Sequence, residues 1–381
     1  MKKEFNLEDF LSPIAFFYAF FQVIHVSALR HVINVPQLRE LIMVIIILLS
    51  IYIVIYFRFS KKMMLIFLFL TTSISINVIV SSTIILLVNL FFIFALARKP
   101  ERIKSVIYSL FLGLIVSTIL ILFLTFIGLI PNHFRVEHGR SRYYLGFLRP
   151  PALPDIYVGI LTCYLVLNRD KLKTRNLFLL LIPSYVVMQF ADGRSSFGVS
   201  AFLIFSIIFI ENQNYFNKNI ITNFLFHTAR FILVTGVFLS IYVSINFPYS
   251  SFLQSHDRLF TGRLQWFSTA WRQNPLRLFG NNLDVNAAHR MIMLDNLYLQ
   301  LLLRGGVIIF IVSIICIFKL LKHYKKNNDY VLLIILIAII INSFVSASWM
   351  PIWKNVLLFS LSEIISQSIV EKNTKNQIII Q

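Results

Sequence analysis

The sequence predicts an all-α, polytopic transmembrane helix bundle of about twelve spans. Apolar residues make up 58% of the 381 residues and charged residues only 13%, and the mean hydropathy is +0.78. An ordinary soluble domain is about 25% charged, so this chain lacks the polar residues that would cover a soluble surface. Apolar stretches of membrane-spanning length recur from Phe10 to Val370. We therefore expect residues 1–381 to form a single integral membrane domain.

A helix needs roughly 20 apolar residues to cross a bilayer core about 30 Å thick. This criterion predicts spans at residues 10–28, 40–57, 63–77, 80–97, 105–129, 154–168, 176–190, 195–210, 229–246, 304–321, 330–347 and 352–370. Residues 63–97 form one apolar run, interrupted only by a polar stretch from Ser73 to Thr83. A single helix there would be about 50 Å long, which exceeds the bilayer core. We expect a short hairpin pair or a re-entrant segment instead.

The N-terminal segment is predicted to be a retained first span. Lys2 and Lys3 precede its apolar run, but acidic residues interrupt it and no small-residue cleavage site follows. Both termini are then expected in the cytoplasm. Cys163 and Cys316 lie in separate apolar runs, where a lone cysteine acts as a small apolar residue. Neither a disulfide framework nor a thiol metal site is predicted.

Lysine and arginine are distributed differently between the two predicted sides of the membrane. With a cytoplasmic N-terminus, every lysine except Lys354 falls on the cytoplasmic side, which satisfies the positive-inside rule. Many arginines fall on the outer side or at its boundary: Arg30, Arg39, Arg135, Arg140, Arg142, Arg149, Arg194, Arg258, Arg263, Arg272, Arg277, Arg290 and Arg304. Since membrane orientation disfavours outer cations, these arginines are expected to have another role.

The outer arginines indicate an anionic ligand. The planar guanidinium group binds carboxylate or phosphate through two parallel hydrogen bonds and tolerates partial burial. The alternative is that each arginine holds a lipid headgroup or the end of a helix. Their concentration in two long loops and one turn favours the ligand. Nucleic acid is excluded as a partner because the basic residues are divided between two sides of a membrane.

Two long outer loops are predicted, at residues 130–153 and 247–303. A structureless loop as long as the second is unusual, so we expect helices that lie along the membrane surface. Apolar residues within 258–273 recur at helical spacing on one face: Phe260, Leu264, Phe267 and Trp271. Arg263 lies at the border of this face, whereas Arg258 and Arg272 point to water. Arg263 is thus either an anion ligand or part of an ordinary interfacial helix.

A charged turn at residues 191–196 is predicted to join two spans. Gly193 permits a tight turn. Arg194 then begins the next helix at its positive end, where a cation is disfavoured. Ser195 and Ser196 are expected to cap this helix and to leave N–H groups facing an anion. The turn is either structural or part of a ligand site.

Common catalytic and metal-binding motifs are missing. The sequence holds no Walker A motif, no Gly-x-Ser-x-Gly, no Cys-x-x-Cys and no His-Glu-x-x-His. No cofactor and no metal are therefore predicted.

Several segments together resemble Wzy-type polysaccharide polymerases and O-antigen ligases. The late outer loop carries residues 262–266 (GRLQW), 274–276 (NPL), 279–280 (FG) and 294–306 (LDNLYLQLLLRGG), which are similar to the C-terminal signature of this superfamily. Residues 142–147 (RYYLGF) resemble the end of its arginine-rich outer loop, and 193–196 (GRSS) resemble its turn between two later spans. The order of these motifs and the layout of the spans cover essentially the whole chain.

Two departures from the pattern favour a polymerase over a ligase. Ligases and many polymerases have His-Asn where this chain has Asp295 and Asn296. Many relatives also have His-Pro-Asn after the Leu-Gly-Phe segment, where residues 148–151 read LRPP. The first departure makes Asp295 the candidate replacement for the histidine.

The resemblance implies a GT-C-like glycosyltransferase on the outer face of the bacterial cytoplasmic membrane. It would join oligosaccharide repeat units carried on undecaprenyl pyrophosphate, without a nucleotide sugar or metal. The expected partners are that lipid-linked oligosaccharide, membrane lipids, and a chain-length regulator and flippase of the same pathway.

Site residues follow from the resemblance and the charge pattern together. Arg263 and Arg194 are expected to bind the pyrophosphate in the catalytic site, with Arg142 and Arg140 as second choices. Asp295 is the candidate base or acceptor-orienting group; alternatively it forms a salt bridge with Arg290 or Arg304. The other predicted substrate-site residues are Arg258, Arg272, Arg304, Asn296 and Tyr298, of which Asn296 and Tyr298 are expected to position the substrate.

Three alternative functions stay open. A flippase for the lipid-linked oligosaccharide would need a cationic path through the bundle, and charges in the middle of the predicted spans are nearly absent. An O-antigen-type ligase is disfavoured by the two departures above. A non-catalytic scaffold leaves the outer arginines unexplained.

Overall fold

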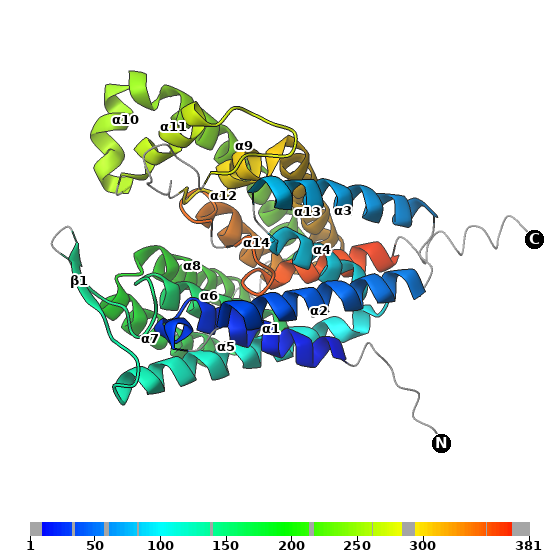
Figure 1. Cartoon of the computed structure of the whole chain (residues 1–381), viewed down its shortest axis with the longest axis horizontal. Helices are drawn as coiled ribbons and strands as arrows, with labels where there is room; N and C mark the ends of the chain where they lie inside the picture. Colours follow the sequence, from blue (N-terminus) through cyan, green and yellow to red (C-terminus); the bar gives the residue numbers. More distant parts are fainter. Residues whose placement is uncertain are drawn as a thin grey trace, which may run out of the picture. The chain divides into compact units, whose positions relative to one another are not determined.

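The computed structural model describes residues 10–32, 35–56, 61–81, 84–137, 140–212, 217–260, 262–283, 294–347 and 349–367. Helices dominate these ranges (Figure 1). The α-helices are α1 (Leu11–His25), α2 (Val35–Tyr56), α3 (Lys61–Ser81), α4 (Ile85–Leu96), α5 (Ile103–Phe126), α6 (Ala152–Asn168), α7 (Thr174–Ala191), α8 (Arg194–Glu211), α9 (Lys218–Asn246), α10 (Ser251–His256), α11 (Arg263–Gln273), α12 (Leu297–Leu299), α13 (Gly306–Lys326) and α14 (Tyr330–Asn342). The predicted cytoplasmic ends of the chain lie outside the described residues.

Among the described residues, five helices are long and apolar enough to cross a membrane: Met63–Val80, Pro100–Phe126, Arg194–Glu211, Lys218–Tyr249 and Gly306–Lys326. Each of the twelve predicted spans overlaps a helix, which confirms the helical segments; how many of them cross a membrane stays a prediction. On α9, Phe231, Val234 and Phe238 are 72%, 60% and 64% exposed. An uncovered apolar stripe of this kind suits contact with lipid.

The apolar run at 63–97 forms two helices, α3 and α4, so the expected division is correct. The first helix of the expected pair is not short, because α3 continues through the polar stretch to Ser81 and is itself long enough to span. Ser73 and Asn77 are 4% and 1% exposed. The polar residues therefore point into the protein and do not end the helix.

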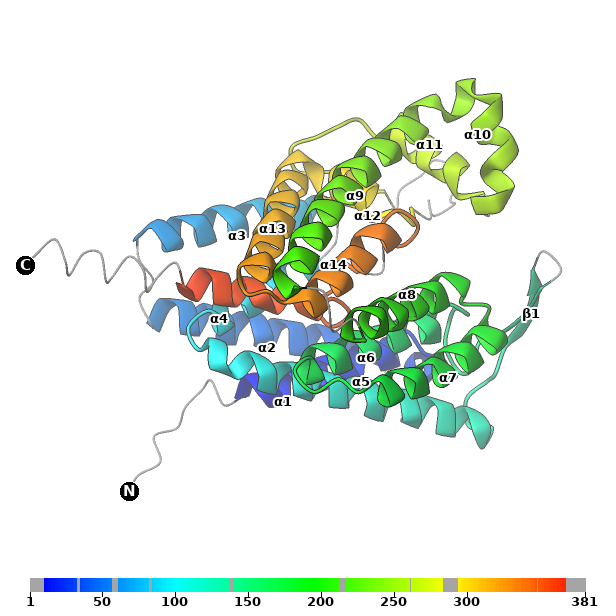
Figure 2. The same cartoon turned by 180° about the vertical axis from the view of Figure 1, so that it is seen from behind.

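The chain divides into two compact units, each discontinuous in sequence. The first unit comprises residues 1–58, 91–215 and 352–381. Within it α1 packs against α2 and α5, and α6 packs against α5, α7 and α8, as the front and back views show (Figures 1 and 2). The segment η7 (Val356–Phe359) returns to α6. The core includes Phe92, whose ring lies 6.1 Å from that of Tyr18 and 5.9 Å from that of Phe359.

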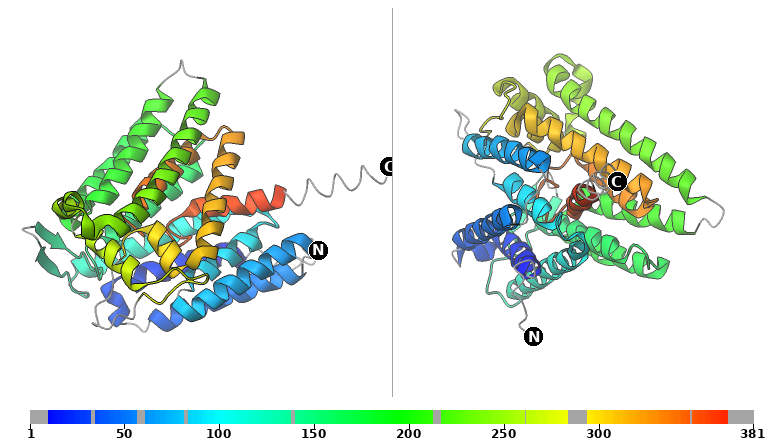
Figure 3. Two further views of the ribbon diagram at one scale, coloured as in Figure 1. Left: turned by 90° about the horizontal axis from the view of Figure 1, so that it is seen from above. Right: turned by 90° about the vertical axis from the view of Figure 1, so that its right-hand side faces the viewer.

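The second unit comprises residues 59–90 and 216–351. Within it α9 packs against α11, α12, α13 and α14. The helix α13 also contacts α3, and Figure 3 shows the helices from two further directions. Buried apolar residues join the end of α9 to the predicted outer loop: Val243, Leu264, Phe267, Ala270, Leu283, Leu294, Leu299 and Leu303. The loop is therefore folded onto a helix instead of being structureless.

The predicted amphipathic helix at 258–273 forms in part. Its C-terminal part is α11, which begins at Arg263, and residues before it form the separate turn η5 (Asp257–Phe260). Leu264 and Phe267 are buried, and Trp271 packs against the same cluster, as the spacing predicted. The Asp257 carboxylate accepts a hydrogen bond of 2.9 Å from the Leu264 backbone N–H, so the turn caps the helix that follows.

The first predicted outer loop contains a two-stranded antiparallel hairpin, β1 (Phe134–Glu137) and β2 (Arg140–Tyr143). This hairpin was not predicted. Each strand has four residues, and although β1 alternates apolar and polar residues, β2 has a single apolar residue, so the alternating pattern is too short to indicate a hairpin.

Candidate functional site

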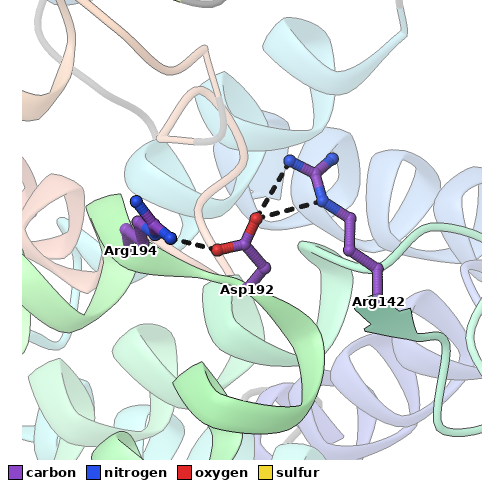
Figure 4. Close-up of polar contacts among 3 residues, drawn as sticks. All are labelled: Arg142, Asp192 and Arg194. Atoms are coloured by element: carbon purple, nitrogen blue, oxygen red, sulfur yellow. Dashed lines mark hydrogen bonds and ion pairs between the residues drawn. The ribbon is translucent and has the colours of Figure 1, made fainter. Parts of the chain in front are cut away.

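The best-defined cationic cluster of the first unit joins the hairpin to the turn between α7 and α8. Nε and Nη2 of Arg142 each lie 3.1 Å from Oδ2 of Asp192. Nε of Arg194 donates a hydrogen bond of 2.9 Å to Oδ1 of the same carboxylate. Figure 4 shows the carboxylate between the two guanidinium groups. Two positive charges share one negative charge, so these three groups together carry a net positive charge.

Exposure differs strongly among the three side chains. The Arg194 side chain is 64% exposed, that of Arg142 22% and that of Asp192 10%. Arg194 therefore presents most of its guanidinium group to the surroundings, while Asp192 fixes its Nε. A forked donor held at one edge and free at the other can bind an incoming phosphate or carboxylate.

The backbone of the turn explains where Arg194 lies. Asp192 ends α7 in the left-handed conformation (φ 51°, ψ 35°), which aspartate adopts more readily than most residues. Gly193 follows, and a Cβ atom there would lie 2.3 Å from Cγ of Pro154 in α6. The close packing of the turn on α6 therefore requires glycine, and Arg194 begins α8 as predicted.

The expected capping by the two serines is wrong. Gly193 is the N-cap residue of α8, and no side chain hydrogen-bonds to that end of the helix. Ser196 is already inside the helix, and its hydroxyl donates a hydrogen bond of 2.8 Å to Asp155 in α6. The serine therefore fastens α8 to α6.

The motif at 142–147 has a structural role beside Arg142. The Gly146 carbonyl accepts a hydrogen bond of 2.8 Å from the Ala28 N–H, and the Leu148 N–H donates one of 3.0 Å to the Val26 carbonyl. Phe147 is fully buried. The Leu-Gly-Phe segment thus anchors the base of the hairpin just after α1, and the anchored hairpin carries Arg142 to Asp192.

The second unit holds a separate pair, Arg263 and Asp295. Nε of Arg263 lies 3.4 Å from Oδ2 of Asp295, and their side chains are 32% and 47% exposed. Asp295 thus pairs with Arg263, the candidate anion ligand, which is not one of the two arginines predicted as its alternative partners. The predicted alternative partner Arg290 lies outside the described residues. Because the carboxylate is half-exposed, it is accessible to a substrate hydroxyl.

Asn296 and Tyr298 hold the segment that carries Asp295. The fully buried Asn296 donates hydrogen bonds of 2.9 Å to the Ser240 hydroxyl and 3.0 Å to the Phe344 carbonyl, and it accepts one of 2.9 Å from the Leu299 N–H. The Tyr298 hydroxyl donates a hydrogen bond of 2.7 Å to the carbonyl of Ile340 in α14. Both side chains are engaged inside the protein, which favours the predicted positioning role over direct substrate contact.

The motif residues Phe279, Gly280 and Arg304 meet at a junction of backbones. The Asn77 side chain donates to the carbonyls of Phe279 and Arg304, at 2.8 and 2.7 Å. Gly280 has a φ of 85°, and a Cβ atom there would lie 2.0 Å from the Arg304 carbonyl oxygen. These residues therefore fasten the outer loop to α3 and to the start of α13. The role of Asn77 was not predicted, because in the sequence it is simply a polar residue within an apolar helix.

The remaining predicted arginines are less well placed. Arg258 and Arg272 are exposed on η5 and α11. Arg304 ends the π-helical turn η6 (Gln300–Arg304) and is half-buried. Arg140 lies in β2, and its side chain is outside the description. Within the described ranges, no group of three or more His, Cys, Asp or Glu side chains is arranged to hold a metal ion.

Comparisons of the chain with models of protein families, with curated proteins and with solved structures found no match. The fold and the site together define a largely helical protein with five membrane-spanning candidates and an arginine–carboxylate cluster in each unit.

Proposed function

We propose that this protein is a surface-polysaccharide polymerase, a GT-C-like glycosyltransferase of about twelve spans in the bacterial cytoplasmic membrane, with both termini in the cytoplasm. It would join repeat units carried on undecaprenyl pyrophosphate. The observation that carries the proposal is the pair of guanidinium groups on the single carboxylate of Asp192. The motif resemblance supplies the reaction class.

The proposed reaction is a glycosyl transfer. The bond between the anomeric carbon of the growing chain and the pyrophosphate oxygen breaks, and the pyrophosphate remains on its lipid. A hydroxyl oxygen of the incoming unit forms the new bond to the anomeric carbon. Arg142 and Arg194 would stabilise the negative charge that develops on the leaving pyrophosphate, because preorganised cationic donors act most strongly where charge appears.

The proton of the attacking hydroxyl needs an acceptor. Asp295 is the proposed base because its carboxylate is half-exposed and paired with Arg263. Arg263 would orient the carboxylate. Asn296 and Tyr298 would fix the segment that carries it.

The test is a deletion of the gene, with extracted surface glycan and lipid-linked oligosaccharide separated by gel. A polymerase predicts loss of the long-chain ladder and accumulation of single repeat units outside the membrane. Single units trapped inside would indicate a flippase, and lipid-linked polymer that is not passed to its acceptor would indicate a ligase. An unchanged ladder would end the proposal.

Complementation then tests the cluster. Wild-type protein should restore the ladder, whereas Arg142→Gln and Arg194→Gln should not. Arg175→Gln, which changes an exposed arginine at the start of α7, is the matched control and should restore it. Restoration by all three variants would remove the cluster from the mechanism.

A further inference from the structure

One lysine departs from the distribution of all the others. Lys354 is the only lysine predicted on the outer side, and it lies just before η7 in the first unit. Its ammonium group is 3.6 Å from Oδ2 of Asp155 and 5.1 Å from the centre of the Trp353 ring. Its side chain keeps an exposure of 15%. A charge this little hydrated is costly to keep, so a functional reason is expected.

The surroundings of Lys354 oppose its charge. Burial removes water from the Lys354 ammonium group, which makes its charge costly; the Asp155 carboxylate partly offsets this cost, and the nearby Arg149 adds to it. The Asp155 carboxylate therefore pairs with a largely buried lysine that also has Arg149 nearby. A second negative charge is needed to balance these cations.

Asp155 connects Lys354 to the arginine turn. Its Oδ1 accepts the hydrogen bond from Ser196, which follows Arg194 by two residues in α8. The neighbouring Pro154 packs against Gly193 of the same turn. Lys354, Asp155 and the turn therefore form one continuous set of contacts within the first unit.

The charges of this set suit a doubly charged anion. Arg142, Arg149, Arg194 and Lys354 supply four positive charges, and Asp155 and Asp192 supply two negative ones, so the set has a net charge of +2. An ammonium group binds phosphate as a point charge, which complements the directional fork of arginine. We infer that Lys354, positioned by Asp155, is a further binding residue for the pyrophosphate group held by Arg142 and Arg194. This inference rests on the proposed function for its choice of ligand.

The test is inorganic pyrophosphate binding to the full-length chain in phosphatidylcholine nanodiscs, measured by calorimetry. Lys354→Met replaces the charged side chain with an unbranched apolar one of similar size that suits its partly buried place, and it should weaken binding by about tenfold or more. Lys354→Arg should stay within about threefold of the wild type, because it keeps the charge. Lys171→Met, at an exposed lysine between α6 and α7, is the control and should bind normally.

The opposite results overturn the inference. Normal binding by Lys354→Met, or no binding by the wild type, would exclude Lys354 as a pyrophosphate residue. If Lys354→Met does not give monodisperse protein, Lys354→Gln replaces it and should weaken binding by about threefold or more, because it also removes the positive charge; unchanged binding would again refute the inference. Loss of wild-type binding in phosphatidylglycerol nanodiscs would show that lipid headgroups occupy the site, which also contradicts it.

The glycan ladder separates this inference from the proposed function. If wild-type protein gives a normal ladder and Lys354→Met binds pyrophosphate as tightly as the wild type, only the role of Lys354 is refuted. If Lys354→Met loses pyrophosphate binding but deletion of the gene does not change the ladder, the anion site is supported and the proposed polymerase function is refuted.

Discussion

Replacing Asp192 with asparagine should disorganise the two arginines without changing the shape of the side chain. An amide has one accepting oxygen, so its NH₂ group must face one of the two guanidinium groups, and two donors repel. The hydrogen bonds to Arg142 are partly buried and their loss is expected to cost about 2 kcal/mol. The contact to Arg194, whose side chain is 64% exposed, adds about 0–1 kcal/mol.

A loss of about 2 kcal/mol corresponds to a roughly thirtyfold change in the population of the arrangement in which residue 192 holds both arginines. We therefore expect polymer formation in membrane vesicles, measured by gel at limiting lipid-linked substrate, to fall by about tenfold to thirtyfold. Asp170→Asn, at an exposed aspartate after α6, is the matched control and should retain full activity. Full activity of Asp192→Asn at normal protein levels would refute the idea that this carboxylate aligns the arginines.

Three further predictions concern the turn and the second unit. Gly193→Ala places a Cβ atom 2.3 Å from a proline ring, so it should destabilise the protein by roughly 1–3 kcal/mol and lower its activity. Gly198→Ala is the control, because a Cβ atom there meets no atom within 4 Å, and it should lower neither. Equal melting curves for the two variants would contradict this packing. Asn296→Ala removes three hydrogen bonds from a buried side chain and should destabilise the protein by roughly 2–4 kcal/mol, which a thermal shift in detergent would detect or disprove. Asp295→Asn should abolish polymer formation with an unchanged melting temperature, because its pair with Arg263 is partly exposed and contributes about 0–1 kcal/mol; wild-type activity would remove it as the base.

Periodicity and charge predicted the parts of the structure that depend on local sequence. Long apolar runs gave the helical segments, since a helix satisfies its own backbone hydrogen bonds wherever the run is long enough. The spacing of Leu264, Phe267 and Trp271 likewise predicted the buried face of α11. The start of α8 at Arg194 followed from a single glycine turn.

The parts that were missed depend on contacts between distant residues. Asp192 was visible as a charged residue in a turn, but its partner Arg142 is 50 residues away and reaches it only through the hairpin. Lys354 was recognised as an exception in the charge pattern, yet its pairing with Asp155 requires the chain to return to α6. The separate roles of Asn77 and Ser240 are equally non-local, since each fastens a loop that begins far along the chain.

The register of the hairpin places Arg135 directly opposite Arg142. Like charges at opposed positions weaken the pairing of two strands. An anion that binds near Arg142 would relieve this repulsion, so occupancy and hairpin order are thermodynamically linked, and by reciprocity a better-ordered hairpin would hold the anion more tightly. Ionic strength then acts on the hairpin in two opposed ways: dissolved salt screens the repulsion between Arg135 and Arg142, and it also screens the attraction between Arg142 and Asp192.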